Sequence, residues 1–261
     1  MKRLLCLSVF GALALTSTAA FAADECAKII ATGHPQYPAI AFKQGDALVG
    51  AAPTLVETIA KKLNVPLESK FMGNWADAQA AARDGKADMI FGIYYNDERG
   101  KYLDYVQPAF MFDDVAIFVA KGKAFPFKGQ DDLIGKKGVT NQGESYGTDF
   151  DAFIKDKLDV ARADGIEDAF KDLLSGKADY LIAGYYPGVA ESAKEGVKDK
   201  VEVLDQAVLT AEMFVAFSKK SPCTALAEKF GQVITEMTTD GSFDAILANA
   251  TAEWDAAQAK H

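Results

Sequence analysis

The chain has 261 residues, 49% of them hydrophobic, and a formal net charge of −9 from 28 basic and 37 acidic residues. This acidic balance argues against nucleic acid or an anionic membrane surface as the partner. Two histidines and three cysteines are too few for a zinc or copper cluster, and no phosphate-binding glycine motif is present. We therefore expect no metal and no cofactor.

The first residues have the order of a secretion signal. Lys2 and Arg3 precede an apolar run over 4–15, and Ala20-Phe21-Ala22 fits a small-residue cleavage site. The run is too short to span a bilayer. We expect a signal peptide over 1–23, cleaved near Ala22, and an exported protein. Cleavage removes two basic and no acidic residues, so the net charge of −9 becomes −11.

Two cysteines remain after cleavage, Cys26 and Cys223. In an oxidising compartment an even pair favours a disulfide, here between the mature N-terminus and a segment near the C-terminus. Closing so long a loop contributes about 4–5 kcal/mol in the chain-entropy account. Two buried free thiols are the alternative.

Apolar periodicity predicts helices alternating with short strands. A turn-rich segment at 33–38 has prolines that are incompatible with a regular element, and the tail 255–261 is expected to fray. In chain order the predictions are a strand at 28–32, a helix at 53–63, a strand at 65–71, a helix at 74–84, strands at 88–93, 115–120 and 136–141, a helix over 150–158, strands at 179–183, 201–204 and 213–218, and helices at 224–238 and 243–254.

This alternation indicates the α/β class with a mostly parallel sheet. Ligands of such sheets bind at the carboxyl ends of the strands, which places 33–37, 74–75 and 92–99 at one edge. An internal echo adds a second unit, because 82–92 and 174–184 share a helix end, Gly-Lys-Ala-Asp, an apolar strand and a glycine. Two lobes of similar plan are one interpretation, and chance likeness at a common helix-to-strand junction is the other.

Arg99 is the main candidate for ligand binding. An arginine in the polar turn after a buried strand can hold a carboxylate through two parallel hydrogen bonds, and Asn96 can add a donor. The alternative is a surface arginine paired with Asp97 or Asp104.

Aromatic residues gather at the predicted strand ends. Tyr94-Tyr95 and Tyr185-Tyr186 follow the two echoing glycines, which suggests facing walls of an apolar pocket, although ordinary core positions are the alternative for several of these rings. The set comprises Tyr37, Phe42, Trp75, Tyr94, Tyr95, Tyr146, Tyr185 and Tyr186.

Ser145 lies in Gly143-Glu144-Ser145-Tyr146-Gly147, which fits the hydrolase pattern Gly-x-Ser-x-Gly. A triad also needs a histidine, but His34 precedes the serine and His261 is the final residue. We therefore expect no catalytic residue, and instead a turn whose N–H groups and Ser145 hydroxyl meet an anion at a helix N-terminus. The acidic pairs 113–114 and 131–132 are expected to be solvated rather than metal-binding.

Four segments, in their order and spacing, resemble the periplasmic solute-binding proteins of ABC transporters, of the polar-amino-acid-binding type (family 3 extracellular solute-binding proteins). The resemblance covers essentially the whole mature chain. The segments are Gly85-Lys86-Ala87-Asp88 through Gly92 to Glu98-Arg99, Leu103 to Phe110, Asp132-Leu133-Ile134-Gly135-Lys136, and Asp240-Gly241-Ser242.

The resemblance implies a two-lobed periplasmic-binding-protein fold of type II, in which each lobe is a mostly parallel sheet flanked by helices and two strands form a hinge. Lobe 1 is expected over 24–112 and 210–261, and lobe 2 over 113–209. A periplasmic monomer is expected to capture a small carboxylate-bearing ligand, an amino acid or similar, for a membrane permease of an ABC transporter. The implied ligand-binding residues are Arg99, Tyr94, Asn96, His34, Tyr37, Trp75, Glu144, Ser145, Tyr146 and Tyr185.

Departures from the family pattern bear on the ligand. The family's usual ammonium-binding aspartate in the second lobe is replaced by Gly184, and the acidic residue often found in the first loop by His34. Tyr94 and Glu144 replace small hydroxyl residues. Glu144 could replace the missing aspartate, or the ligand is not a standard amino acid. A periplasmic enzyme of the cyclohexadienyl dehydratase type, with Glu144 or His34 as its acid, is the alternative on this fold, and a lobe pair that docks a receptor is another.

Overall fold

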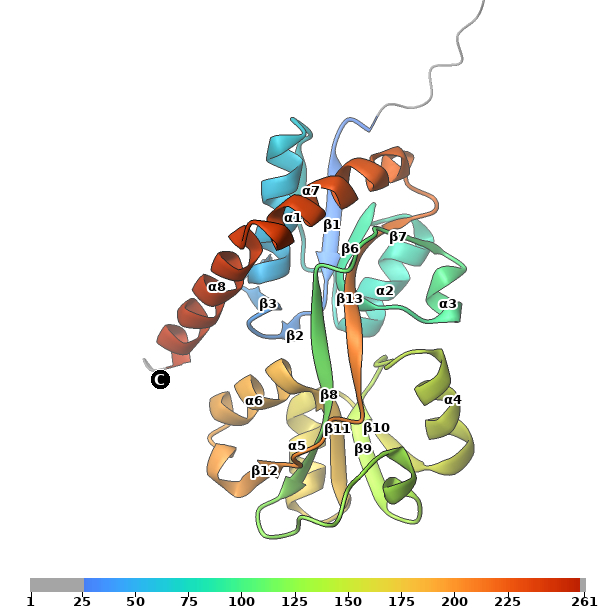
Figure 1. Cartoon of the computed structure of the whole chain (residues 1–261), viewed down its shortest axis with the longest axis vertical. Coiled ribbons are helices and arrows are strands. Elements are labelled where there is room, and N and C mark those ends of the chain that lie inside the picture. The colour runs from blue at the N-terminus through green and yellow to red at the C-terminus, as the bar shows by residue number, and fades with distance from the viewer. Residues whose placement is uncertain (1–25, 259–261) are drawn as a thin grey trace, which may run out of the picture.

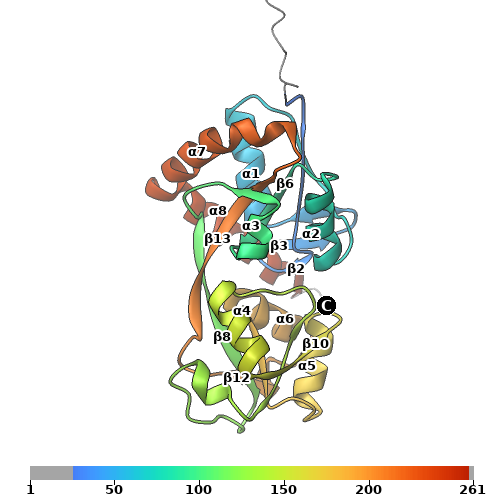
Figure 2. The same cartoon turned by 90° about the vertical axis from the view of Figure 1, so that its right-hand side faces the viewer.

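The computed structural model describes residues 26–258, so the predicted signal peptide lies outside it. Two lobes lie one above the other, joined by two long strands that run through both (Figure 1, Figure 2). These strands are β8 (Met111–Ala120) and β13 (Leu209–Ser218). No helix within the described residues is long and apolar enough to cross a membrane.

Lobe 1, the upper part of Figure 1, is built on three parallel strands in the order β5, β1, β6, with β13 antiparallel to β6. Its elements are β1 (Ile29–Gly33), β2 (Gln36–Tyr37), β3 (Ala41–Gln44), β4 (Ala47–Val49), α1 (Ala51–Lys62), β5 (Leu67–Ser69), α2 (Trp75–Asp84), β6 (Met89–Tyr94), α3 (Asp97–Gly100), β7 (Leu103–Tyr105), the 3₁₀ turn η3 (Pro222–Leu226), α7 (Ala227–Thr239) and α8 (Ser242–Gln258).

The apolar strand β6 is buried on both faces, as expected of a central parallel strand. Met89 and Phe91 belong to the core that α1, α7 and α8 cover, whereas Ile90 and Ile93 pack with α2 on the other face. Helices on both faces leave the carboxyl ends of the strands facing lobe 2.

Lobe 2 repeats this plan with three parallel strands in the order β10, β9, β11, and β8 antiparallel to β11. The helix α5 covers one face of its sheet and α4 the other. Its elements are η1 (Gln130–Leu133), β9 (Lys137–Asn141), α4 (Thr148–Lys157), β10 (Asp159–Ala163), α5 (Ile166–Leu174), β11 (Tyr180–Gly184), α6 (Tyr185–Lys194), η2 (Lys198–Lys200) and β12 (Val201–Val203).

The two sheets are continuous because β8 and β13 pair with each other as well as with strands of both lobes. Their antiparallel register runs from Met111 opposite Met213 to Val115 opposite Leu209. This two-stranded segment is the connection expected for a hinge, and it confirms the predicted fold class.

The predicted helices and the buried strands match the structure to within a few residues. The echo at the helix ends is also present, because Gly85 and Gly176 both have positive φ, the left-handed conformation that glycine adopts at no steric cost. Two expectations were wrong. Within the turn-rich segment 33–38, Gln36 and Tyr37 form the short strand β2, which pairs with β3, while Pro35 and Pro38 lie in turns on either side as expected. The tail is helical up to Gln258, because Trp254 is buried and anchors the last turns of α8.

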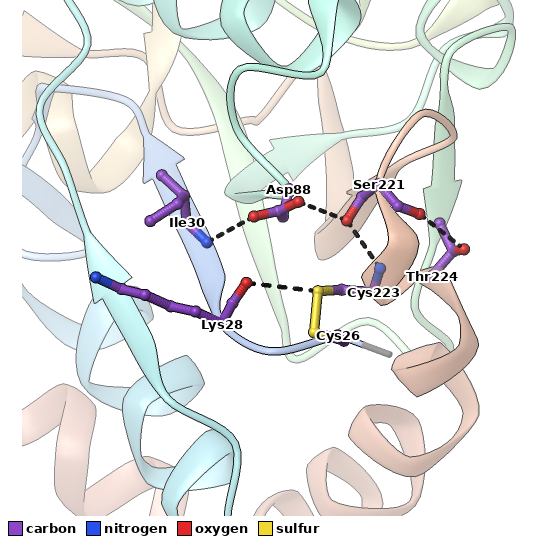
Figure 3. Close-up of a disulfide and its surroundings, with 7 residues drawn as sticks. All are labelled: Cys26, Lys28, Ile30, Asp88, Ser221, Cys223 and Thr224. Atoms are coloured by element: carbon purple, nitrogen blue, oxygen red, sulfur yellow. Dashed lines mark hydrogen bonds between the residues drawn. A yellow bond between two sulfur atoms is a disulfide. The ribbon is translucent and has the colours of Figure 1, made fainter. Parts of the chain in front are cut away.

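Cys26 and Cys223 form the predicted disulfide, across a sequence separation of 197 residues (Figure 3). A short hydrogen-bonded chain extends from it: the Cys223 N–H donates to Ser221 Oγ at 3.0 Å, and Ser221 Oγ donates to Asp88 Oδ1 at 2.7 Å. The other oxygen of Asp88 accepts the Ile30 N–H at 2.8 Å. The disulfide and Asp88 therefore tie β1 and the start of β6 to the C-terminal segment, at the end of lobe 1 away from lobe 2.

Candidate functional site

The loops that follow the parallel strands of both lobes meet in one cleft. From lobe 1 come His34 after β1, Trp75 at the start of α2, Tyr94 at the end of β6, and Arg99 in α3. Lobe 2 contributes Asn141 at the end of β9, the loop 142–147, and Gly184 at the end of β11. The predicted clustering at the carboxyl ends of the strands is therefore correct, and nine of the ten predicted residues lie where the lobes meet.

Arg99 is buried, with 4% of its surface exposed. Its guanidinium donates to Gln79 Oε1 at 3.0 Å, to the Tyr94 carbonyl at 2.9 Å, and to the Gly143 carbonyl of lobe 2 at 3.3 Å. All three acceptors are neutral, and no acidic side chain among residues 26–258 lies within ion-pair distance of it. Neither Asp97 nor Asp104 pairs with it, so the surface alternative was wrong.

Trp75 flanks both Arg99 and His34. The Arg99 guanidinium carbon lies 5.5 Å from the Trp75 ring centroid, within the range of a cation–π contact, and the His34 ring centroid lies 4.8 Å away. Trp75 is 3% exposed, and its Nε1–H has no hydrogen-bond partner among the described residues. The Trp75 ring therefore lies against two predicted site residues and carries an unused donor.

His34 joins the two lobes through Glu144. Its Nε2 lies 2.9 Å from Glu144 Oε1, and its Nδ1 accepts the Gln36 N–H at 2.9 Å. Because Nδ1 is an acceptor, Nε2 carries the proton and donates to the carboxylate. Burial raises the pKa of Glu144, but the hydrogen bond from His34 and the nearby Arg99 cation outweigh burial and hold that pKa below its ordinary value.

A second contact across the cleft joins Asn96 and Ser145. The Asn96 Nδ2 donates to Ser145 Oγ at 2.6 Å, while Asn96 Oδ1 caps α3 by accepting the Arg99 N–H. Ser145 Oγ in turn donates to Asp151, whose carboxylate also accepts the Tyr146 N–H at 2.8 Å. The anion predicted at this turn is therefore the protein's own Asp151. His34, the only histidine among residues 26–258, bonds Glu144 rather than Ser145.

Asp113 is the main residue that the sequence did not indicate. It was expected to be solvated, but it lies on β8 with 1% of its surface exposed. Its Oδ2 accepts the hydroxyls of Tyr37 at 2.6 Å and of Tyr94 at 2.7 Å. Burial raises the pKa of Asp113 to about 6, although both hydroxyl bonds lower it. The alternation of β8, with Phe112 and Asp114 exposed, is the signal that could have placed it inside.

Gly184 lies beside this cluster. A Cβ on Gly184 would be 2.0 Å from the Tyr37 hydroxyl oxygen and 2.7 Å from Asp113 Oδ2. No side chain fits there while Tyr37 holds its place, so a tyrosine hydroxyl and a carboxylate occupy the space that a longer residue at 184 would fill.

The remaining predicted residues differ in their surroundings. Tyr146 is buried in lobe 2, where its hydroxyl donates to the Ile182 carbonyl at 2.9 Å. Tyr185 is 45% exposed at the start of α6, and Tyr95 is 48% exposed. Tyr185 and Tyr186 pack edge to face on each other, so they do not form a wall that faces Tyr94 and Tyr95 as predicted.

The protein's own side chains fill the centre of the cleft. A cavity of only about 10 Å³ remains between Tyr37, Glu144, Tyr146 and Gly184, close to the room one water needs. Larger hollows open around it, of about 290 Å³ next to Trp75 and Asn141, about 550 Å³ next to Arg99 and Ser145, and about 540 Å³ next to Tyr95 and Gly147. No group of three or more potential metal ligands occurs among residues 26–258.

This architecture, two sheets with a polar cleft between them and a two-stranded connection, defines a periplasmic-binding-protein fold. The family model of bacterial extracellular solute-binding proteins, family 3, matches residues 29–251. The chain belongs to this family.

Similar proteins are binding proteins rather than enzymes. The probable amino-acid-binding protein YxeM of Bacillus subtilis is 23% identical over 84% of this chain and 81% of its own length. A probable histidine-binding protein of Campylobacter jejuni is 27% identical over 82% and 80%. Among solved structures, the substrate-binding protein AbpA of Streptococcus pneumoniae, bound to L-arginine, superposes with a TM-score of 0.72 at 20% identity, covering 87% of this chain and 96% of its own. That likeness supports the fold.

Proposed function

We propose that the protein captures a small carboxylate-bearing ligand between its lobes, outside the cytoplasm, and delivers it to the membrane permease of an ABC transporter. The observation that carries the proposal is the buried guanidinium of Arg99, which has no acidic partner among the described residues. A buried charge is costly unless an opposite charge or strong hydrogen bonds compensate it. A ligand carboxylate can supply that compensation.

The contacts from lobe 2 indicate how binding favours closure. The Gly143 carbonyl accepts bonds from both Arg99 and Gln79. A ligand carboxylate is a stronger acceptor than this carbonyl, so it can take over these donors while its remaining atoms contact Glu144 and Asn141. A ligand that contacts both lobes binds the closed state better than the open one, and the population shifts accordingly.

The named relatives are consistent with an amino acid or a similar molecule as the ligand, and we propose this class. Cyclohexadienyl dehydratase activity receives no support from the relatives. His34 and Glu144, the two residues considered as its acid, bond each other.

The contact between Arg99 and a ligand carboxylate is tested by changing the ligand and by changing the protein. Thermal-shift screening of amino acids and other small carboxylic acids should find stabilising ligands, and titration calorimetry of each hit should show that its primary amide binds far more weakly. Arg99→Met should abolish this preference, whereas Lys61→Met, which removes an exposed cation of α1, should keep it. Equal binding of acid and amide would contradict the proposal.

Delivery is tested by uptake. Cells that lack the gene should fail to accumulate the radiolabelled hit, and the wild-type gene, but not Arg99→Met, should restore uptake. Normal uptake in the deletion strain would instead indicate a receptor as the partner. A monomer, which we also propose, is checked by light scattering after size-exclusion chromatography.

A further inference from the structure

Asp113 is a buried carboxylate without a cationic partner. No lysine, arginine or histidine of residues 26–258 forms an ion pair with it, and its Oδ1 has no hydrogen-bond partner there. Its Oδ2 is occupied by the hydroxyls of Tyr37 and Tyr94, and the backbone N–H of Tyr186 also lies near the carboxylate. Native proteins rarely leave a buried charge in this state, so it needs an explanation.

Asp113 is also placed to meet a ligand. It belongs to β8, one of the two strands that connect the lobes, and its carboxylate adjoins Gly184, which has no side chain to cover it. The 10 Å³ cavity between the lobes is lined by Tyr37 and Gly184, both of which border Asp113. Outward movement of Tyr37 would join the carboxylate to that cavity.

The cleft therefore contains two buried charges of opposite sign, neither with an ion-pair partner among the described residues, and Tyr94 lies between them. Arg99 Nη1 donates to the Tyr94 backbone carbonyl, while the Tyr94 hydroxyl at the far end of the side chain donates to Asp113. Tyr94 on β6 and Asp113 on β8 are separated by β13. Two strand spacings and an offset of two residues along the strands put their backbones about 12 Å apart.

We propose that Asp113 recognises a cationic group of the ligand, and that the ligand is a zwitterion whose cation lies several bonds from its carboxylate. The pairing of the ligand's carboxylate with Arg99 rests on the function proposed above. The ammonium or similar group donates to the free Oδ1 of Asp113 and displaces the tyrosine hydroxyls from Oδ2.

The position of Tyr94 determines the spacing. An α-amino acid carries its two charges on neighbouring carbons, so a molecule bound at Arg99 ends before it passes the tyrosine ring. A chain with its amino group at the far end reaches both partners. Asp113 is thus a specificity-determining residue.

Three ligands with the same carbon skeleton test this inference. They are 5-aminopentanoate, with the amine at the far end, norvaline, with the amine on the α-carbon, and pentanoate, with no amine. Calorimetric titration of the wild type should show 5-aminopentanoate binding about tenfold or more tightly than either of the others. Asp113→Asn should lower the affinity for 5-aminopentanoate to that for pentanoate.

Asp114→Asn is the matched control, because Asp114 is exposed on the same strand and bonds Thr210 rather than the cleft. This variant should bind the three ligands in the same order of affinity as the wild type. Thermal melting checks that each variant is folded, and Asp113→Ser replaces Asp113→Asn if the latter is not.

The outcomes separate this inference from the proposed function. The inference is overturned if norvaline binds as tightly as 5-aminopentanoate, or if Asp113→Asn leaves the order of the three affinities unchanged. It is also overturned if none of the three ligands binds. If carboxylates still bind in an Arg99-dependent manner, the proposed function stands. If no acid of the wider panel does so, the proposed function fails as well.

Discussion

The two walls of the cleft offer a ligand different chemistry. Lobe 1 supplies a cation and rings, Arg99 with Trp75 and His34. Lobe 2 supplies acceptors, the Glu144 carboxylate and the Gly143 carbonyl. The lobe 1 wall is also the more self-supporting, because Gln79 and the Tyr94 carbonyl hold Arg99 within that lobe, whereas Glu144 depends on His34 from across the cleft.

This difference indicates an order of events. A guanidinium that is already oriented loses little further freedom when it binds an anion, so lobe 1 is suited to first capture. Lobe 2 then contributes after closure, through bonds that exist only when the lobes meet. Variants of lobe 1 should therefore reduce affinity directly, and variants of lobe 2 should shift the balance between open and closed states.

The largest effect is expected for Arg99→Met. Loss of a buried charge-assisted contact should weaken binding of a carboxylate ligand by about 3 kcal/mol or more, roughly a hundredfold. Calorimetry measures this loss, and Lys61→Met on α1 should leave affinity unchanged. An effect no larger than that of Glu144→Gln would remove the asymmetry between the walls.

Asp113→Asn should raise the free energy of unfolding by about 3 kcal/mol at alkaline pH. Burial is the main cause that raises the pKa of Asp113 from 3.8 to about 6, and the charge of Asp114 adds to it. Hydrogen bonds from the Tyr37 and Tyr94 hydroxyls and from the Tyr186 N–H lower this pKa, but by less than burial raises it. The folded state therefore holds this proton more tightly than the unfolded chain, and the wild type loses stability as pH rises from about 4 to about 6.

Urea denaturation at about pH 4 and about pH 8 measures this difference. The advantage of the asparagine variant should be small at the lower pH and reach its full value above pH 6. A constant difference between the two conditions would mean that Asp113 does not titrate in this range.

Local patterns predicted the fold class because hydrophobic periodicity and glycine at helix ends are written in contiguous residues. Arg99 could also be found, since its turn follows a recognisable strand. The sheet of β2, β3 and β4 was missed because each strand is short and prolines dominate the local signal.

The partners across the cleft were beyond such reasoning for a different physical reason. The bonds from His34 to Glu144 and from Tyr37 to Asp113 join residues far apart in the chain, and they depend on how the lobes are packed. A pair of adjacent aspartates is usually solvated, and only the alternation along β8 distinguishes the buried Asp113 from the exposed Asp114.

Glu144→Gln tests the lobe 2 wall. It removes the charge from the bond to His34, which should cost about 1–2 kcal/mol and favour the open state. Because the pKa of Glu144 is lowered in the folded protein, its contribution is present above the ordinary carboxyl pKa and is lost as pH falls below it. Small-angle scattering should show a larger radius of gyration for the variant at neutral pH, and unchanged scattering would contradict the role of this pair in closure.

The smallest effect is expected for Ser145→Ala. Ser145 accepts from Asn96 across the cleft and donates to Asp151 at the start of α4, so its loss leaves a half-buried amide donor of lobe 1 without its partner. The cost should be about 1 kcal/mol, measured as a lower midpoint of thermal unfolding, with Ser175→Ala on the exposed end of α5 as the unaffected control. Because Asn96 also caps the helix that carries Arg99, a loss well above this value would show that the lobe 1 wall depends on lobe 2 after all, and that its orientation is completed only on closure.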